Sequence, residues 1–354
     1  MKNIIRTAIV GCGAISDIYL TNMQTRFQNL EVVACCAAHL ENALIKAEKY
    51  HIRGCTYEDI LADESIEMVV ILTPAPTHYE LIKRGLLAGK HVYTEKAMTV
   101  DLVQAKELLR LAKERQLYLG AAPDTFLGAA IQKAKQVIQN GDLGEITSFH
   151  IGVNRCMDRA TSQFKFLRQP GGGICYDYGV YHLTALVSLL GPIDKVCGTF
   201  ENRKPIRVNC IESDPEYGQS FTFNNEAQVT GLIRTESGVN GTFSLNGESI
   251  RQDLSIFMIY GTKGVLKIPD PNGFGGELLL IKSKSDVTVL DNDLPYSDNS
   301  RGIGPSDMAD AILFGRCNAA NKELAYHVLD IISQIMVSSQ EERFVPVEST
   351  FDFS

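Results

Sequence analysis

The chain opens on the stretch that decides its fold, Ile4-Ile5-Arg6-Thr7-Ala8-Ile9-Val10-Gly11-Cys12-Gly13-Ala14-Ile15-Ser16. The apolar first half predicts a buried strand over residues 4–10, and the pattern after the glycines predicts a helix to about Gln28. A glycine at position 11 allows a tight turn, and a glycine at position 13 lets the backbone approach a pyrophosphate at the helix N-terminus. Ser16 stands where the third glycine of such a turn usually falls. The stretch predicts a dinucleotide-binding turn, with contacts from Gly11, Gly13, Ala14 and Ile15.

The following hundred residues alternate between strands and helices. Strands are predicted over 31–36, 68–72, 91–93 and 118–122, and helices over 40–50, 78–88 and 100–115. Strands that alternate with helices form a parallel, doubly wound sheet that binds ligands at the carboxyl ends of its strands. We therefore expect an α/β domain of the Rossmann type over residues 1–122, which binds NAD or NADP.

The loops after these strands supply the remaining expected cofactor contacts: Ala37, His39, Thr73, Pro74, His78, Glu95 and Lys96. A dinucleotide fold that prefers NAD usually has an acidic residue after its second strand, for the ribose 2′-hydroxyl. Here Ala37-Ala38-His39 contains none, which removes a repulsion against the 2′-phosphate and favours NADP without excluding NAD. His78 has a second interpretation, as a cap of the helix that follows the proline-rich turn.

Composition limits the partners and the compartment. The net charge is −8 and the basic residues are scattered, so we expect neither a nucleic acid nor a membrane as partner. Nine cysteines without disulfide-like or Cys-x-x-Cys spacing indicate reduced thiols and a cytoplasmic protein, and we expect no metal site. The N-terminus does not read as a signal peptide, and no apolar run reaches the ~18 residues that span a bilayer.

Beyond residue 122 the pattern changes to short strands separated by Gly, Asn and Asp turns. Helices are predicted over 129–139, 307–319 and 323–338, and strands over 147–154, 194–200, 205–211, 219–223, 226–234, 239–246, 252–260, 263–268 and 277–282. This pattern indicates a second domain of the α+β class over residues 123–354, with a large open sheet that is mainly antiparallel.

The chemistry of the second domain is expected in the stretch Gly171-Gly172-Gly173-Ile174-Cys175-Tyr176-Asp177-Tyr178-Gly179-Val180-Tyr181-His182. If a helix begins near Asp177, this carboxylate and Tyr181 are four residues apart and lie side by side, so that both can contact one substrate. His182 then points about 100° further round the helix. The alternative is a glycine turn with an aspartate cap and a tyrosine that only packs.

Taken together, these motifs resemble those of a known family. They are the turn from Ala8 to Ile15, Thr73-Pro74 with His78, Glu95-Lys96, and Gly171-Gly172-Gly173 with Asp177 and Gly179. In order and separation they resemble the glucose–fructose oxidoreductase, inositol dehydrogenase and rhizopine-catabolism (Gfo/Idh/MocA) family of NAD(P)-dependent oxidoreductases, over essentially the whole chain. The resemblance implies that the open sheet also forms a subunit interface, and hence a homo-oligomer, either a dimer or a tetramer.

The resemblance also implies roles for the catalytic candidates. Lys96 matches the lysine of a Glu-Lys-Pro motif beside the nicotinamide, although Ala97 replaces the proline. Asp177 matches the family aspartate. Many members have a catalytic histidine where this chain has Tyr181, but those similar to glucose–fructose oxidoreductase and dihydrodiol dehydrogenase use a tyrosine there as the acid/base. His182, one residue later, is the second candidate. A nearby ammonium such as that of Lys96 would lower the tyrosine pKa from its ordinary value near 10.

Three residues are expected to contact the substrate: Asp124, Phe126 and Arg155. For the first two, core and turn roles are equally compatible with the sequence, and for Arg155 a solvated loop is the alternative. The expected activity is hydride transfer between a nicotinamide cofactor and a sugar, polyol or related cyclic alcohol or ketone. The alternatives are a redox-neutral glycosidase that retains NAD, and a dinucleotide sensor without catalysis.

Overall fold

The computed structural model describes residues 4–250, 255–291 and 293–351. The chain divides into two compact units. Of the described residues, the first contains those up to Asp124 and the later segment Asn299–Tyr326, and the second contains Thr125–Asp298 and those from His327 to Phe351.

The first unit is built on a six-stranded parallel sheet. Its strands are β1 (Ile5–Val10), β2 (Leu30–Cys36), β3 (Arg53–Gly54), β4 (Met68–Ile71), β5 (His91–Thr94) and β6 (Leu119–Ala121). The order β3-β2-β1-β4-β5-β6, with every pair parallel, confirms the predicted doubly wound sheet. The helices that accompany it are α1 (Ser16–Thr25), α2 (Leu40–Tyr50), α3 (Tyr57–Ala62), α4 (His78–Leu87) and α5 (Leu102–Glu114).

The order of the strands fixes where ligands can bind in this unit. All four side chains of β4 are fully buried, as expected for a strand covered on both faces. The chain order reverses between β1 and β4, so the loops that follow these two strands are neighbours at the carboxyl edge. The predicted contact residues of the first domain follow β1, β2, β4 and β5.

The segment 299–326, which contains α9 (Ile303–Phe314), returns to the first unit and is a correction to the expected division into 1–122 and 123–354. Side chains of the first unit satisfy the backbone of this segment. The amide of Asn22 donates to the carbonyls of Asn299 and Arg301, at 2.9 and 2.8 Å. The Asp124 carboxylate, 1% exposed, accepts the N–H groups of Gly302 and Gly304 at the start of α9. These contacts join residues 178 to 279 positions apart, which local sequence patterns do not reveal.

The second unit is built on a nine-stranded mixed sheet in the order β16-β15-β14-β13-β7-β12-β11-β8-β17. Its strands are β7 (Ile146–Asn154), β8 (Ile193–Glu201), β11 (Gln228–Thr235), β12 (Asn240–Asn246), β13 (Ile256–Gly261), β14 (Val265–Lys267), β15 (Leu278–Ser283), β16 (Asp286–Leu290) and β17 (Val345–Pro346). Only β7 and β12 pair in parallel, which confirms the mainly antiparallel sheet.

Two details of this unit differ from the expectation. The segments predicted as strands over 205–211 and 219–223 form a separate two-stranded sheet, β9 (Ile206–Val208) and β10 (Ser220–Thr222). The edge strands β16 and β17 were not predicted, because one is solvent-exposed along nearly its whole length and the other has only two residues. Residues 251–254, where the prediction placed the beginning of β13, lie outside the described part of the chain.

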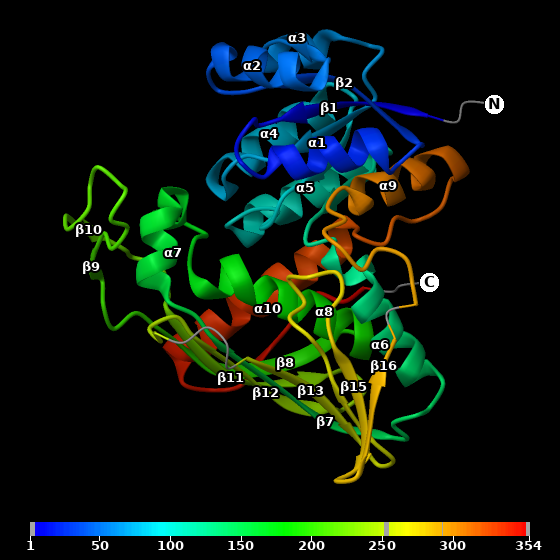
Figure 1. The fold of residues 1–354 in the computed structure, drawn as a ribbon, viewed down its shortest axis with the longest axis vertical. Helices are drawn as coiled ribbons and strands as arrows, with labels where there is room; N and C mark the ends of the chain where they lie inside the picture. Colours follow the sequence, from blue (N-terminus) through cyan, green and yellow to red (C-terminus); the bar gives the residue numbers. More distant parts are fainter. Residues whose placement is uncertain (1–3, 251–254, 292, 352–354) are drawn as a thin grey trace. The chain divides into compact units, whose positions relative to one another are not determined.

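Helices lie over one face of the large sheet (Figure 1). They are α6 (Ala129–Gln139), α8 (Val180–Leu190) and α10 (Lys322–Glu341), while α7 (Met157–Gln163) lies beside β9. Along β11 the buried Val229 and Ile233 alternate with the exposed Thr230 and Leu232, so the opposite face is open. This alternation places the core of the unit between the sheet and the helices.

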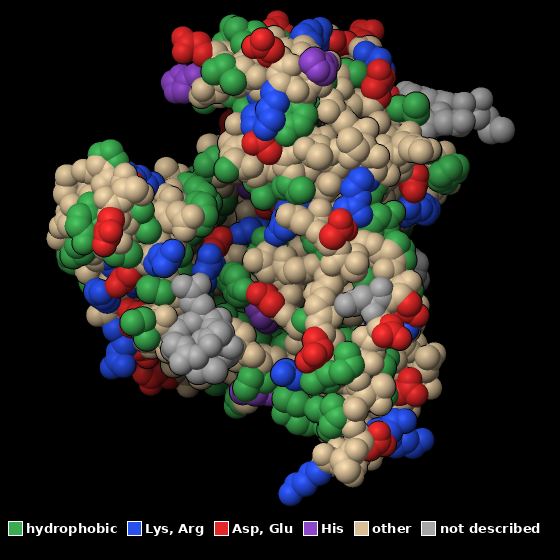
Figure 2. All heavy atoms as spheres, viewed as in Figure 1, with side chains coloured by type: hydrophobic (Ala, Val, Ile, Leu, Met, Phe, Trp, Pro, Cys, Tyr) green, Lys and Arg blue, Asp and Glu red, His purple; other side chains and the backbone are tan. Residues whose placement is uncertain are grey.

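The surface view shows acidic and basic side chains interspersed on the face that it presents (Figure 2). Within the described residues, no helix combines the length and apolar character needed to cross a bilayer.

The buried carboxylate of Asp124 makes the stability of the protein depend on pH. Its pKa is raised from 3.8 to about 6, mainly by burial, against the lowering effect of the N–H groups of Gly304 and Gly302. Between these pH values the unfolded chain loses the proton first, so stability falls as the pH rises, by about 3 kcal/mol at most.

We predict that the unfolding free energy of the wild type, relative to Asp124→Asn, decreases from pH 4 to pH 6 and is constant above. Asparagine retains an oxygen acceptor for the α9 N–H groups but does not titrate. Urea denaturation of both proteins across this range measures the difference. A difference that does not change with pH contradicts the burial of a titrating carboxyl at this position.

Candidate functional site

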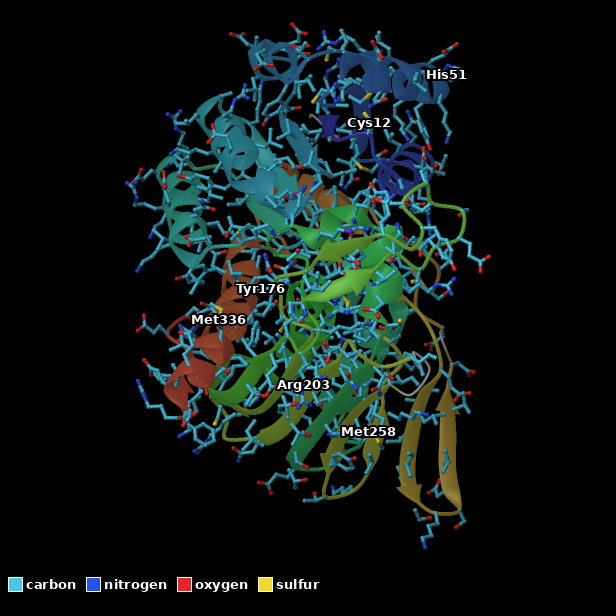
Figure 3. The ribbon with its side chains drawn as sticks, turned by 90° about the vertical axis from the view of Figure 1, so that its left-hand side faces the viewer. Cys12, His51, Tyr176, Arg203, Met258 and Met336 are labelled. Atoms are coloured by element: carbon cyan, nitrogen blue, oxygen red, sulfur yellow. The ribbon has the colours of Figure 1, made fainter. Side chains whose placement is uncertain are left out.

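The glycine turn after β1 has the features that a dinucleotide turn requires. Gly11 has a φ of +108°, and a Cβ there would lie 2.9 Å from the carbonyl carbon of Leu72. Gly13 is exposed, and a Cβ there would meet no atom within 4 Å, so the space beside it is open to a ligand. The buried Ser16, in place of a third glycine, donates its hydroxyl to the Gly13 carbonyl at 2.6 Å. Cys12 of this turn is labelled in Figure 3.

His78 joins two of the predicted cofactor loops. It is fully buried, and its Nδ1 and Nε2 lie 2.7 Å from the carbonyl oxygens of Ala97 and Thr73 respectively. Burial lowers its pKa. Thr77, not His78, is the N-cap residue of α4. The structure therefore assigns His78 the role of tying the loop after β4 to the loop after β5, and its direct contact with a cofactor stays a prediction.

Glu95 holds the backbone that carries Lys96. Its Oε1 accepts the hydroxyl of Tyr19 at 2.7 Å, and its Oε2 accepts the backbone N–H of Lys96 at 3.1 Å. Tyr19 is fully buried in α1, so this contact is anchored in the core of the first unit. The peptide bond between Lys96 and Ala97, at the position of the replaced proline, is cis. Lys96 is thus placed at the carboxyl edge of the sheet by a carboxylate next to it in sequence.

The loop after β2 is the most accessible of the predicted cofactor loops. Ala37 is half-buried, and Ala38 and His39 are exposed. His39 is the N-cap residue of α2 but makes no capping hydrogen bond with its side chain. An exposed histidine and two alanines leave room for a ligand at this end of β2.

In the second unit, the helix that carries Asp177 begins differently from the expectation. Residues Cys175–Gly179 form a π-helical turn, and the α-helix α8 begins only at Val180. Asp177 therefore lies in the π turn rather than at the start of an α-helix, and the side-by-side placement of Asp177 and Tyr181 stays a prediction. Gly179 at the end of this turn packs closely on the sheet, because a Cβ there would lie 2.7 Å from Leu245 of β12.

The structure brings together two of the predicted site residues, Asp177 and Arg155. Nη1 of Arg155 donates to Oδ2 of Asp177 at 2.6 Å, and the two side chains are only 19% and 11% exposed. The guanidinium also lies over the ring of Tyr178, 4.7 Å from its centre. Arg155 is therefore not a solvated loop residue, since it orients the Asp177 carboxylate with a charge-assisted hydrogen bond.

The two acid/base candidates of α8 differ in their surroundings. Tyr181 is 8% exposed and packs edge-on against Tyr178, with 6.1 Å between ring centres. His182 is 2% exposed and packs against Phe257 of β13, and burial lowers its pKa. His182 thus contacts the sheet beneath α8.

Three functional candidates escaped the sequence analysis. Tyr178 donates its hydroxyl to Asp270, and its pKa is raised by burial and by that carboxylate. Glu226 accepts the N–H of Cys175 on Oε1 at 2.9 Å, and burial raises its pKa to about 7. Asp270 and Glu226 are distant in sequence from the glycine-rich stretch and have no motif of their own. The one available signal in the sequence was Gly172-Gly173, because adjacent glycines indicate that another part of the chain packs closely against the backbone. The glycines do not indicate which residue that is.

The remaining predicted residues have structural surroundings. Asp124 caps α9, and Phe126 is 3% exposed in the short helix Thr125–Leu127. Their contact with a substrate stays a prediction. Within the described chain, His, Cys, Asp and Glu side chains form no group of three or more that could hold a metal ion.

Comparison with known proteins identifies the class to which this fold and site belong. Residues 5–122 match an oxidoreductase family with an NAD-binding Rossmann fold, and residues 131–267 match the GFO/IDH/MocA C-terminal domain. The chain is 30% identical over 275 residues to trans-1,2-dihydrobenzene-1,2-diol dehydrogenase of Bos taurus, and the match covers 75% of each chain. It belongs to the Gfo/Idh/MocA oxidoreductase family, as the sequence motifs predicted.

Two further matches extend this comparison. An uncharacterized oxidoreductase of Schizosaccharomyces pombe is 32% identical over 206 residues, which cover 57% of this chain and 56% of the relative, so the match spans little more than half of that protein. Levoglucosan dehydrogenase, solved in complex with NADH and L-sorbose, has a TM-score of 0.84 at 19% identity and covers 98% of this chain and 99% of its own. This structural match indicates a shared fold.

The open space beside Gly13 leads to a test of the dinucleotide turn. We predict that Gly13→Val abolishes dinucleotide binding without lowering the melting temperature, because the new side chain occupies ligand space and its Cβ meets no protein atom within 4 Å. Gly11→Val is the contrast, since its side chain meets the Leu72 backbone and destabilises the fold. Fluorescence titration with NADH or NADPH and thermal denaturation separate the two effects. Unchanged affinity in Gly13→Val excludes this turn as the pyrophosphate site.

Proposed function

We propose that this protein is an NAD(P)-dependent oxidoreductase that transfers a hydride between the nicotinamide and a sugar, polyol or related cyclic alcohol or ketone. The observation that carries the proposal is the Arg155–Asp177 ion pair, which holds a carboxylate four residues before Tyr181 in a member of this family. The bovine relative is named for a cyclic diol, and the levoglucosan dehydrogenase structure contains L-sorbose. Both names support a polyhydroxylated or cyclic substrate.

Each of three side chains has a chemical task in this proposal. When bound, the nicotinamide ring accepts or supplies the hydride. The Asp177 carboxylate, oriented by Arg155, accepts a hydrogen bond from a substrate hydroxyl. Tyr181 takes the proton of the hydroxyl that is oxidised, or returns it in reduction, and the Lys96 ammonium stabilises negative charge on the reacting oxygen.

Tyr181 is proposed over His182 because family members similar to dihydrodiol dehydrogenase have a tyrosine acid/base at this position; both side chains are buried and pack against the Tyr178 ring. A general base must reach the proton that it removes. His182 packs on both Phe257 under α8 and Tyr178, and burial lowers its pKa. Tyr181 also packs against Tyr178, whose ring contacts Arg155, so both candidates border the cluster that holds Asp177.

We also propose a homo-oligomer that forms through the open face of the large sheet. The side chains of Leu232, Ile256 and Val289 are 49%, 40% and 59% exposed. Apolar side chains spread over a sheet face that no described helix covers support an interface between copies of the chain. Sedimentation analysis distinguishes a dimer from a tetramer.

All nine cysteines are free thiols, which supports a cytoplasmic location.

For the cofactor we propose a preference for NADP over NAD. We predict that the protein binds NADPH more tightly than NADH, and that Ala37→Asp lowers the NADPH affinity by at least about tenfold, or ~1.4 kcal/mol. A carboxylate there repels the 2′-phosphate but accepts a 2′-hydroxyl. Fluorescence titration of both proteins measures this, with little background because the chain has no tryptophan. Tighter binding of NADH by the wild type contradicts the preference, and binding of neither contradicts the whole function.

The proton-transfer role has its own test. We predict that Tyr181→Phe lowers kcat by at least about 100-fold, the range for loss of a general acid/base, while the Kd for the cofactor is unchanged. The matched control is Tyr176→Phe, which removes a hydroxyl from the same segment (Figure 3). We expect this variant to leave kcat unchanged. Steady-state kinetics with the best substrate from a sugar and polyol screen gives both values. Wild-type turnover in Tyr181→Phe transfers the role to His182.

A further inference from the structure

The helical segment that carries Asp177 and Tyr181 begins without a cap of its own. The first N–H groups of a helix have no partner inside it and need acceptors from elsewhere. The residues before this segment are Gly171, Gly172 and Gly173, which have no side chains to offer. The residue at the N-cap position of the π turn, Ile174, makes no capping hydrogen bond with its side chain either.

Glu226 supplies these acceptors from a distant loop. It lies between β10 and β11, and its backbone carbonyl accepts the N–H of Ile174 at 3.1 Å. Its Oε1 accepts the N–H of Cys175 at 2.9 Å, and the N–H of Tyr176 is a further donor to this residue. One residue thus satisfies three successive N–H groups at the start of the segment.

The glycine run is matched to this contact. A Cβ on Gly173 would lie 2.0 Å from the carboxyl carbon of Glu226, so any side chain there displaces the carboxylate. A Cβ on Gly172 would lie 2.0 Å from the carbonyl oxygen of Leu167. Asn225, next to Glu226, donates to that same carbonyl at 3.1 Å. The loop before β11 therefore holds both the glycine run and the start of the helical segment.

We propose that Glu226 is a positioning residue for the reaction, which caps the segment Ile174–Leu190 and so sets the positions of Asp177 and Tyr181. This inference rests on the proposed function. The backbone N–H of Asp177 donates to Gly173 at 2.8 Å, which links the capped turn directly to the carboxylate that Arg155 holds. A carboxylate at a helix N-terminus also interacts favourably with the helix dipole. Glu226 acts through the backbone and touches no reacting atom.

The first test uses kinetics and a conservative rescue. Glu226→Ala lowers kcat by about tenfold to 100-fold, because displacement of the catalytic segment misaligns its side chains, while the Kd for the cofactor is unchanged. Glu226→Gln retains an oxygen acceptor and recovers most of kcat. Glu201→Ala and Glu201→Gln are the matched controls, since Glu201 is an exposed carboxylate at the end of β8, the strand that pairs with β11. Equal losses in Glu226→Ala and Glu226→Gln, or wild-type kcat in both, overturn the inference.

The second test is a double-mutant cycle that identifies the contact itself. Gly173→Ala alone reproduces the loss seen in Glu226→Ala, because the new Cβ displaces the carboxylate. In the Glu226→Ala background the same substitution costs nothing further, so the two losses do not add. Additive losses overturn the inference. If Glu226→Ala does not fold, kcat of Gly173→Ala is compared with kcat of the double variant Gly173→Ala/Glu226→Gln. The clash persists in the double variant, so both must show the same loss of kcat, and different losses overturn the inference.

A third measurement separates this inference from the proposed function. Hydrogen exchange at the amides of Cys175 and Tyr176 is slow in the wild type and Glu226→Gln and fast in Glu226→Ala, whether or not a substrate is known. If the wild type turns over no sugar or polyol but this pattern holds, only the proposed function fails. If the wild type is active and exchange is unchanged in Glu226→Ala, only the role of Glu226 fails.

Discussion

Backbone groups at the ends of helices and strands must find hydrogen-bond partners, and here side chains from distant parts of the same unit provide them. A buried N–H or C=O without a partner costs free energy comparable to a lost hydrogen bond. Asp124 meets this need for α9, His78 for one of the carbonyls of Thr73 and Ala97, and Glu226 for the start of the Ile174–Leu190 segment. The starts of α9 and of the Ile174–Leu190 segment are therefore held by residues far away in the chain, whereas the Lys96 loop is held by its neighbour Glu95.

This way of holding loops explains why several polar residues near the proposed site are buried. Partners for a buried polar group must be precisely placed, because the low dielectric raises the cost of a missing hydrogen bond. Glu95 uses both carboxylate oxygens, one for Tyr19 and one for the backbone of Lys96. Arg155 and Asp177 satisfy each other while both are mostly buried. A buried side chain with fixed hydrogen-bond partners has few alternative conformations. These contacts therefore keep Lys96 and Asp177 in a fixed geometry.

The helices and strands of this protein are more predictable from its sequence than the contacts between them. Strands and helices of the first unit were found because apolar periodicity and glycine turns are local signals, and the β1 turn is built as Gly11, Gly13 and Ser16 indicated. The helical segment with Asp177 begins earlier than predicted, with a π turn over Cys175–Gly179 that side-chain periodicity does not signal. Arg155 was proposed for substrate and is found on Asp177, a pairing across 22 residues that no local pattern carries.

By itself, the sequence determined the parallel sheet with its exposed dinucleotide turn, the family, and the candidate set Lys96, Asp177 and Tyr181, because each depends on residues close together in the chain or on motifs in a fixed order. Only the tertiary structure decided which distant side chains hold these residues: Glu226 beneath Gly173, Arg155 on Asp177, and the return of residues 299–326 to the first unit. The physical reason is that a helix start or a buried carboxylate needs a partner of a certain kind, but the fold alone determines which residue along the chain comes close enough to provide it.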